Sequence, residues 1–220
     1  MNKYNTFEKI LIYSGILVFM TFILLPFVEM FYASLRPLDH LFRSPYQFYS
    51  DDLSFWAYRE MWNTVPMLGR YIFNSFFLAT SVAVITLIFV IPAAYSYARF
   101  KFPAKNTSLY VLLAINMFSG AVLLIPLYKV LRTFGLLNSY QAMIVPGVAF
   151  LIPTSIWLLK SYFEKIPIDL EEAAFVDGAS RVQILRHIIA PLSTPGLVVV
   201  GIYAYIPTTT NPGVLSGAII

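Results

Sequence analysis

The sequence predicts an all-α fold, a polytopic bundle of transmembrane helices. Hydrophobic residues make up 59% of the 220 residues and charged residues only 12%, whereas soluble domains contain about a quarter charged residues. Several uncharged runs reach the ~20 residues that a helix needs to cross a bilayer. The runs are continuous rather than alternating, which argues against a transmembrane β-barrel. We expect residues 1–220 to form a single membrane domain.

Five spans are expected in this order: residues 10–30, 71–98, 108–127, 142–159 and 196–206. No small-x-small cleavage site follows the first span, so we expect an uncleaved helix rather than a signal peptide. The next segment, residues 35–70, is rich in the aromatic side chains that favour a membrane–water interface. Prolines in the spans are consistent with helices that are kinked around a pathway. They are equally consistent with the ordinary composition of membrane helices, in which proline is common.

The distribution of basic residues predicts the orientation. Arg99, Lys101 and Lys105 follow the second span, and no acidic residue lies among them. Such a short loop is cytoplasmic by the positive-inside rule. A cytoplasmic N-terminus and four crossings then place residues 160–187 in the cytoplasm as well.

A polar island (residues 166–191) separates the fourth and fifth spans, and it is predicted to contain two short helices. Asp169 and Glu172 have the spacing of a capping box at the start of the first helix. Gly178 is suited to end that helix, because glycine adopts the left-handed conformation without a steric penalty. Glu172 therefore has two candidate roles, a helix cap or a charge presented to a partner, and the spacing favours the cap.

The second helix of the island is expected to begin at a second capping box, formed by Ser180 and Gln183. Pro191 lacks an amide donor, so we expect a break there. Two capped helices joined by a glycine make a rigid knob that suits the transmission of force between subunits. A well-capped loop without further function would show the same local features.

The order Glu-Ala-Ala at 172–174, Asp-Gly-Ala-Ser at 177–180, then Ile188 and Pro191 resembles the cytoplasmic coupling loop of permease subunits in binding-protein-dependent, ATP-driven importers. One departure is Ala190, where that family usually has leucine. The resemblance implies that the following residues contact an ATPase subunit: Glu171, Glu172, Ala173, Ala174, Asp177, Gly178, Ala179, Ser180, Ile188 and Pro191.

Four further segments, residues 74–75, 94–103, 125–128 and 135–140, are similar to carbohydrate-uptake permeases of the maltose type. The resemblance covers roughly residues 10–200. It implies six helices, a heterodimer with a second permease, two ATPase subunits and an extracytoplasmic sugar-binding protein. It also implies a bacterial-type cytoplasmic (inner) membrane with its lipid, no cofactor on this chain, and Mg-ATP on the partner subunit.

The sequence offers no candidate residues for enzymatic catalysis. Gly196 and Gly201 have the spacing of a phosphate-binding loop, but Ile202 follows where that motif needs lysine. The chain has no cysteine, and His40 and His187 lie on opposite predicted faces of the membrane, so no paired site for metal or catalysis is expected. No basic cluster suggests nucleic acid.

Two alternatives are a secondary transporter and a non-transporting membrane scaffold. A secondary transporter would need ionisable residues within its spans, and spans two to four have none at their centres. Asn116 and Ser119 are weak candidates for a substrate pathway, although an asparagine in a membrane helix more often bonds a neighbouring helix than a substrate. After about residue 206 the sequence departs from the family pattern, so we expect the last spans to be truncated or aberrant.

Overall fold

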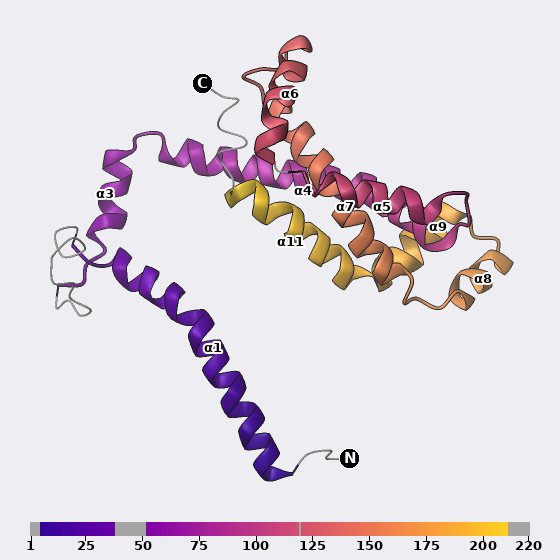
Figure 1. Ribbon diagram of the computed structural model, residues 1–220, viewed down its shortest axis with the longest axis horizontal. Coiled ribbons are helices and arrows are strands. Elements are labelled where there is room, and N and C mark those ends of the chain that lie inside the picture. The colour runs from indigo at the N-terminus through magenta and orange to yellow at the C-terminus, as the bar shows by residue number, and fades with distance from the viewer. Residues whose placement is uncertain (1–4, 38–51, 119, 211–220) are drawn as a thin grey trace. The chain divides into compact units, whose positions relative to one another are not determined.

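The computed structural model describes residues 5–37, 52–118 and 120–210, and every regular element among them is a helix. These residues fall into two compact units, Met1–Gly69 and Arg70–Ile220. The all-α prediction is confirmed. Figure 1 shows the elements in chain order.

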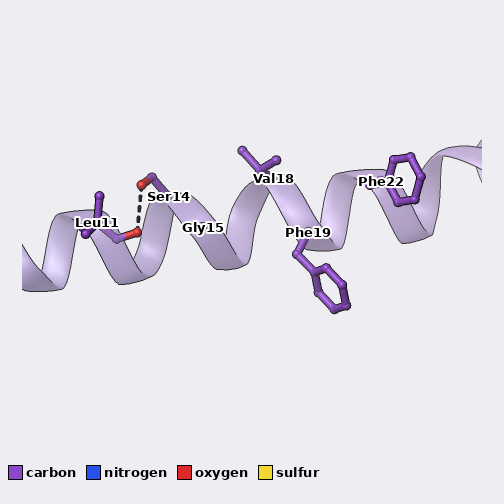
Figure 2. A pocket seen from close by; sticks show the side chains of 6 residues that line it. All are labelled: Leu11, Ser14, Gly15, Val18, Phe19 and Phe22. Atoms are coloured by element: carbon purple, nitrogen blue, oxygen red, sulfur yellow. Dashed lines mark hydrogen bonds between the residues drawn. The ribbon is translucent and has the colours of Figure 1, made fainter.

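The first unit contains α1 (Thr6–Ser34) and α3 (Trp56–Thr64). The apolar side chains of α1 are exposed almost throughout, as expected of a helix whose solvent is lipid. Gly15 leaves a shallow apolar hollow on α1, between Leu11 and Phe19, and the Ser14 hydroxyl donates to the Leu11 carbonyl there (Figure 2). The predicted interfacial segment is helical at α3, while its residues 38–51, including His40, lie outside the described residues.

The second unit contains the other helices of the described residues, with α4 from Arg70 onward. They are α4 (Leu68–Arg99), α5 (Lys105–Ile115), α6 (Gly120–Thr133), α7 (Gln141–Phe163), α8 (Asp169–Val176), α9 (Arg181–Ile184), the π-helix η1 (Leu185–Ile189), α10 (Ala190–Leu192) and α11 (Thr194–Thr210). In Figure 1, α11 runs alongside α7, and α8 and α9 lie together at one end of this bundle.

The core of the second unit lies between α4, α7 and α11 and continues into the polar island. Val90, Leu159 and Val200 are fully buried in one cluster, one from each of these three helices. Ile184 and Ile189 from the island are fully buried in the same cluster. The island is therefore packed onto the bundle and is not a loose connection.

Three helices within the described residues are long and apolar enough to cross a membrane: Phe7–Ser34, Leu68–Arg99 and Gln141–Phe163. A fourth crossing results if Arg181–Leu192 and Thr194–Thr208, which meet at an 82° bend, are one span. The first, second and fourth predicted spans are thus single helices.

The third predicted span, residues 108–127, is not a single helix among the described residues. The helix ends at Ile115 and resumes at Gly120. The amides of Asn116 and Met117 bond carbonyls only three residues back, which tightens the last turn of α5 and ends it. Asparagine and glycine are both poor helix formers, so the interruption falls between them.

The fifth span also differs from expectation. We expected it to run over residues 196–206 and to be truncated or aberrant after that, but α11 begins at Thr194 and continues through Pro207 to Thr210. A proline removes one helical hydrogen bond, and membrane helices tolerate that loss. Residues 211–220 lie outside the described part of the chain.

Candidate functional site

The first helix of the polar island, α8, ends as the sequence predicts. Gly178 has a φ of 83°, a left-handed conformation that side chains disfavour. The Gly178 amide donates to the Phe175 carbonyl at 3.0 Å, and the Ala179 amide donates to the Ala174 carbonyl at 2.9 Å. This pair of bonds is a Schellman motif, so the turn between the two island helices has a defined geometry.

The start of α8 does not follow the prediction. The N-cap is Ile168 rather than Asp169, so the prediction of a capping box between Asp169 and Glu172 is wrong. Ile168 already has helical backbone angles, and its carbonyl accepts the Glu172 amide at 3.1 Å. Asp169 is consequently the first helical residue, where its charge suits the positive end of the helix dipole. Glu172 is exposed one position beyond the capping-box place.

The second predicted capping box is confirmed. The Ser180 amide donates to the Gln183 side chain at 2.8 Å, and the Gln183 amide donates to the Ser180 hydroxyl at 3.4 Å. Ser180 has extended backbone angles, as an N-cap residue does. The reciprocal bonds place Ser180, the N-cap of α9, two residues after the left-handed glycine.

The helix that follows continues beyond Pro191, where we expected a break. Residues Leu185–Ile189 form a π-helical turn, in which the Ala190 amide donates to the Leu185 carbonyl. The wider turn shifts the bonding pattern just before the proline, which has no amide to donate. The bend instead falls at Ser193, between α10 and α11, and measures 82°.

Glu171 lies inside the second unit and not on the outer surface of the island. Its side chain is 6% exposed. One carboxylate oxygen accepts the Tyr95 hydroxyl at 2.8 Å, and the other is ion-paired with Arg99. Arg99 also donates to the Ile166 carbonyl at 2.9 Å. This internal role differs from the partner contact implied for Glu171 by the resemblance.

The other residues of the implied contact set lie on or near the surface of the island. Ala174, Ala179 and Ile188 are partly buried, whereas the following are exposed: Glu172, Ala173, Asp177, Gly178, Ser180 and Pro191. A hollow of about 340 Å³ lies beside the glycine turn, between Asp177, Gln183 and Ile188. His187 lines it too, with its Nδ1 atom 3.0 Å from the Gln183 carbonyl.

Four side chains of this site could not be recognised from the sequence. Val176 is 88% exposed and Val182 73% exposed, so each island helix exposes a branched apolar side chain. Their spacing carries no signal that separates them from core residues. Tyr95 and Arg99 were also missed as parts of the site, because their partner Glu171 is more than 70 residues away.

The weak pathway candidates are only partly described. The Asn116 amide donates to the Thr154 hydroxyl at 2.6 Å, linking the end of α5 to α7. This is the interhelical bond that asparagine commonly makes in membrane helices. Ser119 lies outside the described residues, so its pathway role stays a prediction.

The fold resembles a solved transporter. A chain of a bacterial ABC transporter, described as involved in the import of the acidic polysaccharide alginate, matches with a TM-score of 0.72. The match covers 94% of this chain and 74% of that chain at 24% sequence identity. At this identity the likeness concerns the fold alone.

Three relatives are similar in sequence over most of the chain. A sulfoquinovosyl glycerol transport system permease of Agrobacterium fabrum is 32% identical over 83% of this chain and 64% of its own length. A trehalose/maltose transport system permease of Thermococcus litoralis is 34% identical, over 86% and 68%. An inner membrane ABC transporter permease of Escherichia coli is 30% identical, over 91% and 72%. The chain thus spans about two thirds of the relatives' length.

The matched family model spans the bundle and the whole polar island. It describes the inner membrane component of binding-protein-dependent transport systems, and it matches residues 71–209. The chain belongs to this family of inner membrane transport components.

Proposed function

We propose that this chain is a permease subunit of a binding-protein-dependent, ATP-driven importer for a sugar or oligosaccharide. It forms half of the translocation pathway, and it couples to a separate ATPase subunit through the polar island. Family membership supports the class, and the geometry of the island supports the coupling role. ATP hydrolysis then belongs to the partner, which also holds the Mg-ATP.

The observation that carries the coupling role is the outer surface of the island. Val176 and Val182 are exposed on the island, as are the charged residues Glu172 and Asp177. Apolar side chains that project from a rigid, capped segment suit burial in a groove of another protein, because their burial removes apolar area from water without ordering a flexible loop. An ATPase subunit is the partner that the family membership suggests.

The substrate class is supported by the transport systems to which the relatives belong. They include permeases of transport systems for trehalose/maltose, sulfoquinovosyl glycerol and diacetylchitobiose. These compounds differ in charge and size, and a carbohydrate part is common to them. We therefore propose a carbohydrate and leave the particular sugar open.

The remaining partners follow from the same family. We propose a heterodimer with a second permease, two ATPase subunits and an extracytoplasmic sugar-binding protein. The N-terminus and the polar island then lie on the cytoplasmic side. Three basic residues between the end of α4 and the start of α5, Arg99, Lys101 and Lys105, support this orientation.

The test is transport by the reconstituted complex. The full chain is purified with its second permease and ATPase, placed in proteoliposomes, and supplied with a panel of labelled oligosaccharides and the binding protein. We expect uptake that requires both enclosed ATP and the binding protein. Uptake that follows an imposed proton or sodium gradient without ATP would instead identify a secondary transporter and overturn the proposal.

A further inference from the structure

The end of α4 holds both halves of the polar island, although it is far from them in sequence. Arg99 is the last residue of α4, and its side chain is 9% exposed. Its guanidinium bonds two points of the island at once, the Glu171 carboxylate in α8 and the Ile166 carbonyl just before α8. A planar guanidinium that bonds two separate groups fixes both distance and direction.

Both oxygens of the Glu171 carboxylate are bonded within this contact. Arg99 occupies one oxygen, and the Tyr95 hydroxyl donates to the other at 2.8 Å. Tyr95 precedes Arg99 by one helical turn, so both donors project from the same face of α4. A buried carboxylate with both oxygens bonded cannot shift without leaving a charge unpaired, which makes the arrangement rigid.

The second island helix meets the same end of α4 through aromatic contacts. The Arg181 guanidinium lies 4.8 Å from the centre of the Phe100 ring and 5.2 Å from that of Phe175. Phe100 in turn packs edge-on against Tyr95. The residue after α4 thus contacts α9, while Tyr95 and Arg99 contact α8.

We infer that Arg99 is a positioning residue for energy coupling: it makes the polar island move together with α4. The inference rests on the proposed function. Chain connectivity alone would join the island to α7 and α11. The Arg99–Glu171 pair adds a direct connection to α4, which runs through the bundle core with Val90 and Ala94 fully buried. A displacement of the island by the ATPase then reaches α4 directly.

The test separates folding from positioning by removing all three polar groups together. A triple variant, Tyr95→Phe, Arg99→Met and Glu171→Leu, leaves no unpaired buried charge, so the bundle is expected to form. Arg99→Lys is a milder second variant that keeps the charge and loses the fork. The matched control is Lys160→Met with Glu164→Leu, which removes an ion pair of 2.7 Å that is partly exposed at the end of α7.

The first measurement is hydrogen exchange of the α8 amides in the full chain in lipid nanodiscs, without any partner. We expect roughly tenfold faster exchange over residues 170–176 in the triple variant, a smaller increase in Arg99→Lys, and no change in the control. Unchanged exchange in the triple variant would show that the Arg99 contacts do not hold the island, and would overturn the inference.

The second measurement is the amount of sugar transported per ATP hydrolysed in the assembled complex. We expect this ratio to fall about fivefold or more in the triple variant and to stay at the wild-type value in the control. A preserved ratio despite faster exchange would overturn the positioning role. If the wild-type complex shows no ATP-driven uptake, the proposed function fails, and the exchange measurement still decides whether Arg99 holds the island.

Discussion

Gly196 lies directly against the ring of Tyr162 where α11 crosses α7. A Cβ atom at Gly196 would stand 2.5 Å from the Tyr162 Cγ atom and 2.9 Å from its Cβ atom. These atoms lie close to the α7 backbone and cannot swing away as the end of a flexible side chain can. The two helices therefore approach each other to a distance that only glycine permits, as at many contacts between membrane helices.

Gly196→Ala is expected to destabilise the bundle by about 1–3 kcal/mol, because the added methyl group forces α11 away from α7. The measurement is thermal unfolding of the purified chain in detergent. Gly201→Ala is the matched control on the same helix, since its Cβ would meet the Leu87 Cδ1 atom at an ordinary 3.9 Å. Equal midpoints for the two variants would contradict the close contact.

Gly178→Val is expected to uncouple ATP hydrolysis from transport. The left-handed backbone costs a β-branched residue about 1–2 kcal/mol, and nothing lies within 4 Å of the position to clash with the side chain. The effect would therefore act through the turn between α8 and α9 alone. The measurement is sugar uptake per ATP in proteoliposomes.

Gly135→Val is the control for this experiment. Gly135 has a φ of 66° and also has open space around it, but it lies in the connection between α6 and α7. We expect a similar backbone strain without loss of coupling. An equal loss of uptake in both variants would attribute the effect to general instability.

Substitutions of Glu172 test whether a charge on the island surface contributes to ATPase binding. The sequence favours a capping role for Glu172, but the structure does not show one, because Ile168 is the N-cap of α8. We therefore expect Glu172→Gln and Glu172→Ala to weaken association with the ATPase alike, by about fivefold, which corresponds to ~1 kcal/mol. Binding of the purified ATPase to the permease in nanodiscs measures this. Wild-type affinity in Glu172→Gln with a loss only in Glu172→Ala would restore the capping role.

Local motifs explain why part of the island was predictable. Ser180 and Gln183 are three residues apart, and Gly178 satisfies a backbone requirement of its own turn, so the sequence around them contains the whole interaction. The Asp169 prediction failed because the backbone angles of Ile168, set by the chain entering α8, decide where the helix begins. Neighbouring residues do not encode that path.

Long-range contacts were not predictable in the same way. In the sequence, Arg99 is an ordinary basic residue at the cytoplasmic end of a span. Only the packing of α8 against α4 brings it to Glu171. The interruption after Ile115 shows a related limit. The run is apolar enough for a span, yet hydropathy does not register the tightened turn at Asn116.

The most direct test of the account is whether the outer face of the polar island lies on the ATPase. A photo-crosslinking amino acid is placed at Val176, which is 88% exposed, in the full complex. Val122 on α6, 67% exposed, is the control position. We predict an ATPase–permease adduct from position 176 and none from position 122. An assembled, ATP-hydrolysing complex that yields no adduct at 176 would contradict the account.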